Sequence, residues 1–377
     1  MFKDLQRAES QEQRAKPKKV KGKRLKVRDF VCSVFSPLAF SLLLSALCPL
    51  PSAQTLRVLT HDAFAVSEEV IAEFTGETGI VLEFLKAGDA GEIVNRAILT
   101  KDNPLADVLY GIDNSLLARA INENIFLPYE SPALKRLNLT NSMKEQFQFD
   151  ESFSVTPVNV CYINFNLDKA YFEENNLALP TDITDLTTET YKGLTVVQNP
   201  ATSSPGLGFM LSTIARFGEE GDYTWLDYWR DLRNNAVLVS SGWNDAYFTS
   251  FTRYGGDKPI VLSYATSPSA EGGATVNLFC EKCVYEQIEA VGILKGTQNE
   301  DAAQKFIDYM LSERFQNDIP GTMFVYPLHN DSILSNEFEQ FATRPNREHI
   351  ARLTSDVVEA NLQRWLKEWT MVVEQEQ

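Results

Sequence analysis

From residue 55 onward the sequence alternates short apolar segments with amphipathic ones, and this alternation constrains the fold more than any other feature. The short segments are rich in β-branched and aromatic residues, and the segments between them repeat apolar residues at helical spacing. Such alternation is typical of α/β proteins with largely parallel sheets. We expect strands at 56–60, 80–85, 107–110, 159–165, 194–198, 236–240 and 259–263, and helices at 68–74, 92–100, 115–122, 206–217, 223–233, 302–314 and 355–373.

The domain organisation follows from the lack of any low-complexity linker after residue 54. Two lobes without a linker would have to be joined by strands that cross between them, and segments 159–165 and 284–294 are the best candidates. Ligands of α/β folds bind in crevices at the carboxyl ends of strands. We expect one lobe to comprise 54–158 with about 288–335, a second to comprise 159–287, and 336–377 to form a C-terminal helical segment of unassigned lobe.

The first 53 residues have the pattern of a secretory signal peptide. A basic stretch at 16–28 precedes an apolar run at 30–47, and the small residues Ser52 and Ala53 follow. A membrane anchor is the alternative, but Pro37 and four serines dilute the apolar run. We therefore expect export to the periplasm, with no stable membrane insertion after processing.

Charge narrows the choice of ligand. The chain has a formal net charge of −16, and beyond residue 53 it carries 24 Lys/Arg against 47 Asp/Glu, a balance of −23. Such a surface repels phosphate backbones, so we expect no nucleic-acid partner. A cationic ligand is favoured instead.

Three of the five cysteines lie beyond the signal segment: Cys161, Cys280 and Cys283. Export permits disulfides, so the bridge could form within the Cys280–Cys283 pair or between Cys161 and Cys283, with one thiol left over. A zinc site would need further ligands, and the three histidines beyond residue 53 are widely dispersed. We expect neither a metal site nor a cofactor.

The segment 199–208 runs from an expected strand into an expected helix. Ser204 could cap this helix, with Pro205 at its first position. The hydroxyls of Thr202, Ser203 and Ser204 would then form a polar pocket at a helix N-terminus, although an ordinary capped helix gives the same pattern. The segment matches no nucleotide-binding motif.

Loops after other strands carry further candidate ligand contacts. In the segment 87–91 glycines permit close backbone approach, and Asp89 offers a carboxylate, or simply caps the next helix. Segments 240–243 and 263–268 place a Trp and a Tyr beside hydroxyl groups, where aromatic faces could hold a flat cation or could belong to the core.

Catalysis is less well supported than binding. A Ser–His–Asp hydrolase of the common type needs a GxSxG turn, and the sequence has none. We therefore expect a receptor and not an enzyme, with a secreted hydrolase as the rival class.

Six of these segments together resemble the thiamine-binding substrate-binding proteins of ABC transporters. The resemblance implies a type II, two-lobed fold that closes on thiamine or its phosphates and delivers it to permease subunits with a cytoplasmic ATPase. It extends in order over about 55–370, through 315–320 and 326–327. The six segments are 58–65, 87–91, 108–114, 199–208, 242–247 and 262–268.

The resemblance also implies particular site residues. The chain departs from the family pattern at His61 and Ala270, where aromatic residues are expected, and at Phe324, where a tryptophan is expected. Fewer aromatic faces leave a polyamine or a pyrimidine precursor of thiamine as rival ligands. Ferric ion is a rival on the same fold, but such iron sites favour adjacent tyrosines, and Tyr264 is followed by Ala265. The implied ligand contacts are Asp89, Ala90, Ser203, Ser204, Trp243, Tyr264, Ala265, Thr266 and Ser267, with His61, Asp62 and Phe324 as further candidates.

Overall fold

The computed structural model describes residues 54–137, 152–329 and 331–373. The expected signal peptide, residues 1–53, lies outside this part of the chain. None of the helices described has both the length and the apolar character needed to cross a bilayer.

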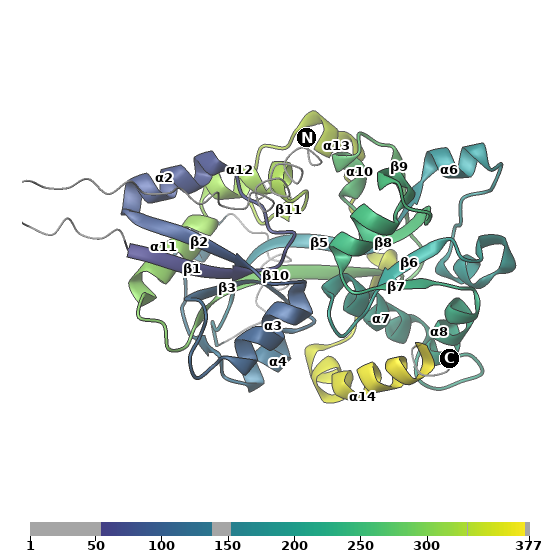
Figure 1. Ribbon diagram of the computed structural model, residues 1–377, viewed down its shortest axis with the longest axis horizontal. Helices are drawn as coiled ribbons and strands as arrows, with labels where there is room; N and C mark the ends of the chain where they lie inside the picture. The colour runs from purple at the N-terminus through teal and green to yellow at the C-terminus, as the bar shows by residue number, and fades with distance from the viewer. Residues whose placement is uncertain (1–53, 138–151, 330, 374–377) are drawn as a thin grey trace, which may run out of the picture. The chain divides into compact units, whose positions relative to one another are not determined.

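The described strands form one sheet of twelve, with a path of β2-β1-β3-β10-β5-β8-β6-β7 (Figure 1). The pairs of β1 with β2 and β3, and of β6 with β7 and β8, are parallel, as the alternation predicts. Strands β4 and β12 pair with β10, and β9 and β11 with β5. The bounds are β1 Gln54–Thr60, β2 Ile80–Lys86, β3 Val108–Asp113, β4 Phe126–Leu127, β5 Thr156–Asp168, β6 Thr195–Gln198, β7 Leu238–Ser240, β8 Ile260–Tyr264, β9 Thr275–Leu278, β10 Val284–Leu294, β11 Tyr326–Pro327 and β12 Ile350–Ala351.

Two long strands, β5 and β10, connect the halves of this sheet. They pair antiparallel with each other from Thr156 to Ile163, and β10 continues into pairing with β3. The second half of β5 pairs with β8 and β9 instead. Both segments proposed as crossing strands therefore form them, and they make the centre of the sheet antiparallel. The lobe boundaries stay predictions.

The helices match the expected segments closely, with one exception. The segment 302–314 forms two helices, because Ser312 begins a new helix by accepting a hydrogen bond from the Phe315 amide at 3.3 Å. The main helices are α2 Glu68–Thr78, α3 Ala90–Leu99, α4 Leu117–Asn122, α6 Lys169–Glu174, α7 Ser204–Phe217, α8 Trp225–Asn234, α9 Trp243–Asp245, α10 Ser267–Ala270, α11 Glu300–Met310, α12 Glu313–Thr322, α13 Asn336–Phe341 and α14 Ser355–Val373.

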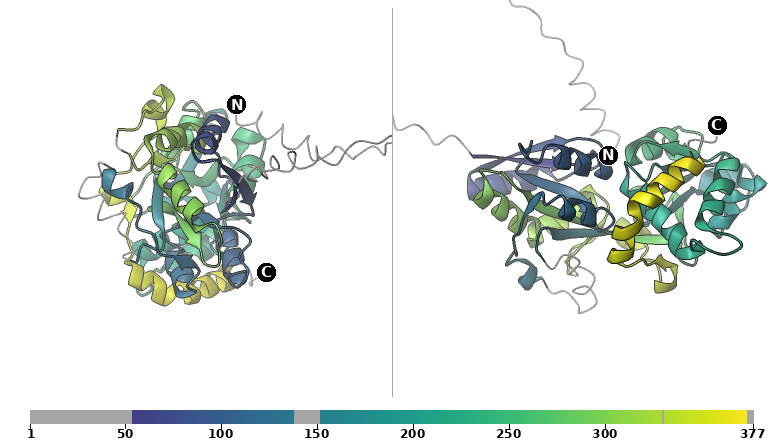
Figure 2. Two further views of the ribbon diagram at one scale, coloured as in Figure 1. Left: turned by 90° about the vertical axis from the view of Figure 1, so that its left-hand side faces the viewer. Right: turned by 90° about the horizontal axis from the view of Figure 1, so that it is seen from below.

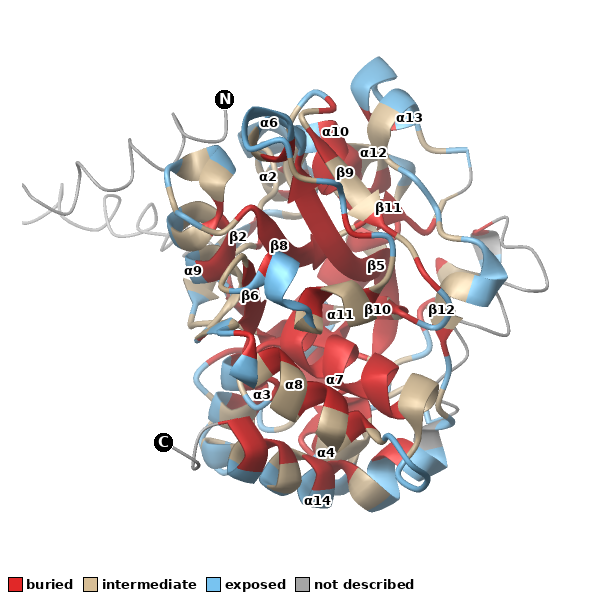
Figure 3. Cartoon of the chain, turned by 90° about the vertical axis from the view of Figure 1, so that its right-hand side faces the viewer, coloured by how far each residue is buried: buried red, intermediate tan, exposed pale blue. Residues whose placement is uncertain are grey.

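Side chains that alternate along the strands bury both faces of the sheet. In β1, Val58 belongs to the buried cluster that includes residues of α2 and α11, whereas the next residue, Leu59, belongs to the cluster that includes residues of α3 and α4. Every residue of β5 is buried, and Figure 3 shows β5 and β10 as the buried centre of the fold. The central strands thus have no solvent-facing side.

The C-terminal helix α14 contacts two distant helices, and Figure 2 shows it along one side of the fold. Trp369 packs edge-on against Trp229 of α8, with ring centroids 5.5 Å apart. Near the other end of α14, Asn122 of α4 donates a hydrogen bond of 3.0 Å to Glu359. The expected C-terminal helix therefore forms and spans from α8 to α4.

The structure also distinguishes the two disulfide alternatives. Cys280 and Cys283 are bonded to each other, just before β10, and Cys161 is a buried free thiol on β5. Arg216 lies beside this bridge, donating to the Cys280 sulfur at 3.1 Å and to both oxygens of Asp182.

Candidate functional site

Asp89 connects two loops that are far apart in the sequence. As the N-cap of α3, its Oδ1 accepts from the Ala90 amide at 2.7 Å, while its own amide donates to Glu92 at 2.9 Å. Its Oδ2 accepts from the main-chain N–H of Trp243 at 2.8 Å. Both readings of Asp89 thus remain compatible, because the carboxylate caps a helix and also lies at the junction of the two loops.

A second contact joins the same parts of the chain. The Gly91 amide donates a hydrogen bond of 2.9 Å to the Thr202 carbonyl. A Cβ at residue 91 would lie 2.7 Å from that oxygen, so only glycine permits this approach. Gly91 was expected to permit close approach of a ligand, and in the structure it permits close approach of the loop before α7.

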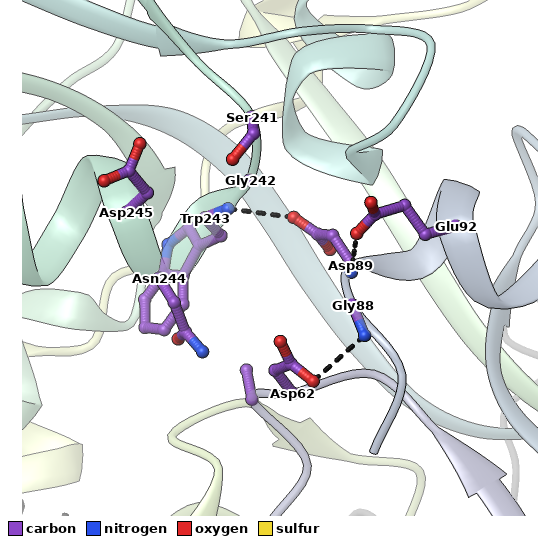
Figure 4. Close-up of a pocket in the computed structure, with 10 residues that line it drawn as sticks. Asp62, Gly88, Asp89, Glu92, Ser241, Gly242, Trp243, Asn244 and Asp245 are labelled. Carbon is purple, nitrogen blue, oxygen red and sulfur yellow. Dashed lines mark hydrogen bonds between the residues drawn. The ribbon is translucent and has the colours of Figure 1, made fainter. Parts of the chain in front are cut away.

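A pocket opens between these loops, and Figure 4 shows its lining. Ten residues line it, and four of them carry carboxylates, whereas none is Lys or Arg. The Asp62 amide donates to the Gly88 carbonyl at 2.9 Å, and the Gly88 amide donates to Asp62 Oδ1 at 3.0 Å. These two hydrogen bonds hold the loop at Asp62 against the loop at Gly88. The lining residues are Asp62, Ala63, Gly88, Asp89, Glu92, Ser241, Gly242, Trp243, Asn244 and Asp245. A cation is the ligand charge that such a lining favours.

Trp243 is the aromatic side chain of this pocket. Its indole stacks on Tyr247, with centroids 4.6 Å apart and planes 21° apart, and its Nε1 donates to Ser263 Oγ at 2.8 Å. Tyr264 lies 6.0 Å from it, centroid to centroid. The indole is thus held in one orientation before any ligand arrives.

The residues of the turn after β8 differ in how far they are exposed. Tyr264 is partly exposed, whereas Ala265, Thr266 and Ser267 are buried. The Ala265 amide donates to the Tyr162 carbonyl at 2.8 Å, and its carbonyl accepts from Asn277 at 2.9 Å. The Ala265 main chain therefore serves to hold the turn.

The start of α7 differs by one residue from the expectation. Ser203, not Ser204, is the N-cap, so Ser204 is the first helical residue and Pro205 the second. The Ser204 hydroxyl donates to the buried carboxylate of Asp113, at the end of β3. The Ser203 hydroxyl, in contrast, is buried and has no hydrogen-bond partner among the described residues. The Ser204 side chain therefore bonds to Asp113, and the Ser203 side chain makes no capping hydrogen bond.

A buried polar network lies below these loops. His61 Nε2 is 3.3 Å from Glu289 Oε1, at ion-pair distance although the N–H is not aligned for a hydrogen bond. The Tyr110 hydroxyl donates to Glu289 Oε2 at 3.1 Å, and Asn159 donates to Tyr110. Gly111, at φ +96°, leaves room for the imidazole, since its Cβ would lie 2.3 Å from His61.

The environment of this network shifts several pKa values. Burial opposes ionisation of Glu289, but His61, Asn159 and Tyr110 outweigh it and lower the pKa of this carboxyl. Burial likewise disfavours charged His61, yet the adjacent carboxylate of Glu289 raises the pKa of the imidazole. Burial raises the pKa of the Asp113 carboxyl.

Sequence reasoning did not single out Asp113 and Glu289. Asp113 lies within a segment that carries the family resemblance, at the carboxyl end of a strand, so its position was a usable signal. Glu289 is buried within the crossing strand β10, which also carries Glu286 and Gln287, and a buried carboxylate needs a partner. Both oxygens of Glu289 find such partners.

Phe324 and Ala270 are not among the lining residues of the pocket. Phe324 follows α12 at φ +55° and is partly exposed. Ala270 ends α10. No group of three metal-binding side chains is assembled within the described ranges.

Comparison with known proteins identifies the relatives of this chain. The model of the family of bacterial extracellular solute-binding proteins matches residues 103–346. The thiamine-binding periplasmic protein of Escherichia coli is 27% identical over 343 residues, covering 88% of this chain and 97% of the relative. Iron uptake protein A1 of Synechocystis is 25% identical over 294 residues, or 73% and 76% of the two chains.

A solved structure supports the fold. A periplasmic thiamin binding protein superposes with a TM-score of 0.73 at 26% identity, covering 85% of this chain and 96% of that one. The resemblance drawn from the sequence is confirmed, as is the mixed α/β fold of the two-lobed type. The chain belongs to the family of bacterial extracellular solute-binding proteins.

Proposed function

We propose that this protein is a periplasmic receptor, not an enzyme, that binds thiamine and delivers it to the permease of an ABC importer. The junction of Asp89 with Trp243 carries the proposal, because it brings a carboxylate to the main chain of an aromatic residue that lines an acidic pocket. Thiamine joins a cationic thiazolium to an aminopyrimidine, and this chemistry requires an aromatic face and carboxylate or hydroxyl partners.

Two of the candidate contact residues have hydroxyl groups without a hydrogen-bond partner, which supports a bound ligand. The hydroxyls of Ser203 and Thr266 are buried and lack hydrogen-bond partners among the described residues. A buried hydroxyl without a partner costs free energy, so a ligand that bonds to it recovers that cost. The proposed contacts are those that the family resemblance implies: Asp89, Ala90, Ser203, Ser204, Trp243 and Tyr264 to Ser267, with His61, Asp62 and Phe324 as further candidates.

The relatives support the same ligand without being uniform. The Escherichia coli relative is named for thiamine and the Synechocystis relative for iron. The acidic lining accepts either cation, but Trp243 offers a stacking face that only an organic ring can use.

Calorimetric titration tests the proposal directly. The purified protein, refolded to remove retained ligand, is titrated with thiamine, thiamine monophosphate, thiamine diphosphate, spermidine and ferric citrate. We expect saturable binding of thiamine with a Kd below about 1 μM, or about −8 kcal/mol. Tighter binding of spermidine or iron, or no binding of any thiamine form by folded protein, would reject the thiamine receptor.

A further inference from the structure

Tyr247 and Glu271 lie on the side of Trp243 away from the pocket and do not line it. Tyr247 covers one face of the Trp243 indole, with centroids 4.6 Å apart and planes 21° apart. Trp243 lines the pocket, whereas Tyr247 and Glu271 are not among its lining residues. Tyr247 is buried against Val196 and Val261, so its ring is fixed from the sheet side.

The hydroxyl of Tyr247 donates a hydrogen bond to Glu271 Oε1. The other carboxylate oxygen, Oε2, accepts from Thr275 Oγ1 at 2.6 Å. Burial raises the pKa of Glu271, while both hydroxyl donors and the charge of Arg253 favour its ionised form and Asp168 disfavours it. A carboxylate with both oxygens engaged is held in place and is well positioned to act on the rings beside it.

This arrangement has an electrostatic consequence for the Trp243 face. A cation is attracted to an aromatic face by the ring quadrupole, and a nearby buried negative charge adds to that attraction. A phenol that donates to a carboxylate also carries more negative charge on its ring, since hydrogen-bonded groups polarise one another. The Glu271–Tyr247–Trp243 series therefore directs negative potential toward the pocket.

We propose that Tyr247 and Glu271 are specificity-determining positioning residues that make the Trp243 face select a cationic ring over a neutral ring of the same shape. The proposal deepens the proposed function and rests on it, because it assumes that the ligand stacks on Trp243. Neither residue touches the ligand, so both act through the indole.

Two conservative variants separate charge from shape. Glu271→Gln removes the charge but keeps the size and a hydrogen-bond acceptor, and Tyr247→Phe keeps the ring but removes the hydrogen bond. Each variant and the wild type are titrated with thiamine and with a neutral isostere in which a thiophene ring replaces the thiazolium. Glu173→Gln, an exposed position on α6, is the control for loss of one negative charge.

We expect both variants to bind thiamine about tenfold more weakly and the neutral isostere within about twofold of wild type. The Glu173→Gln control should bind both ligands as the wild type does. Circular dichroism and thermal unfolding verify the folded state, and Tyr247→Phe alone decides the matter if Glu271→Gln does not fold.

Other results overturn the proposal. Equal weakening for both ligands would mean that the pair only supports the structure, and unchanged affinities would mean that it has no role in selection. If wild-type protein binds no thiamine, the proposed function fails and this inference fails with it. Failure of the proposed function is recognised from the wild type alone, whereas equal weakening and unchanged affinity are seen only when the variants are compared with it.

Discussion

The main-chain N–H of Trp243 donates a hydrogen bond of 2.8 Å to Oδ2 of Asp89, which lies 154 residues earlier in the chain. The same carboxylate caps α3 through its other oxygen. One side chain therefore fixes the start of a helix and the position of the loop that carries the pocket's indole. A substitution at residue 89 should affect both functions, and the two can be measured separately.

Replacing Trp243 with Ala should weaken thiamine binding at least tenfold, or about 1.4 kcal/mol. The variant removes the aromatic face that lines the acidic pocket, and Trp243→Phe should lose less because it keeps a flat ring. Calorimetric titration gives the affinities, with Leu238→Ala, an exposed residue on β7 outside the pocket lining, as the control. Unchanged affinity in folded Trp243→Ala would remove this residue from the site.

Asp89→Asn and Asp89→Ala should separate ligand binding from helix capping. Asn keeps one oxygen for the Ala90 amide but presents an NH₂ group, which cannot accept from Trp243. We expect both variants to bind thiamine about tenfold more weakly. Only Asp89→Ala should also lose about 1 kcal/mol of unfolding free energy, from the lost cap.

Titration and urea unfolding measure these two effects, and Asp257→Asn at an exposed position is the matched control. If Asp89→Asn bound thiamine as tightly as the wild type, the carboxylate would be a helix cap alone.

The His61–Glu289 pair should make stability depend on pH in both directions. The raised pKa of His61 adds stability that is complete below the unfolded value of about 6.5 and is lost as pH rises through the folded pKa. The lowered pKa of Glu289 adds stability that is present above the unfolded value of about 4.3 and is lost as pH falls through the folded pKa. The pair thus stabilises the fold most in mildly acidic solution.

Urea unfolding of wild type and His61→Gln from about pH 5 to about pH 9 measures the contribution of the coupled His61–Glu289 pair, because groups that do not interact with His61 cancel in the difference. The difference in unfolding free energy should shrink as pH rises. A difference that is constant across this range would show that His61 does not gain a charge-stabilising partner on folding.

Trp369→Ala should destabilise the protein by about 3–5 kcal/mol, because it empties a fully buried site against Trp229. Met371, on the same helix but 42% exposed, provides the control, and Met371→Ala should change stability by less than about 0.5 kcal/mol. Urea denaturation measures both. Equal, small losses would mean that α14 contributes little to the stability of α8.

Periodicity predicted the outer part of the fold well, because β1, β2, β6 and β8 each follow an apolar pattern that local sequence determines. The short strands β4, β11 and β12 were not predicted, since two-residue strands exist only through pairing with β5 or β10. The break between α11 and α12 was missed because a single capping serine, Ser312, interrupts a helical apolar pattern.

The sequence predicted which residues belong to the site better than it predicted the hydrogen bonds between them. Residue type and loop position identified Asp89 and Trp243, but no sequence pattern reveals that one accepts from the main chain of the other. Glu289 was missed because a strand pattern marks which residues are buried, not which buried residues are paired.

The two contacts of α14 differ in strength, and this difference determines how the helix would respond to movement. The Trp369–Trp229 contact is fully buried, whereas the Asn122–Glu359 hydrogen bond lies at the exposed surface. Exposed polar contacts exchange with water at little cost, and buried aromatic contacts do not. Any rotation of α4 relative to α8 would therefore break the Asn122–Glu359 hydrogen bond before it separated Trp369 from Trp229. A fluorescent label on the exposed neighbour Ala360 would report such a rotation when ligand is added.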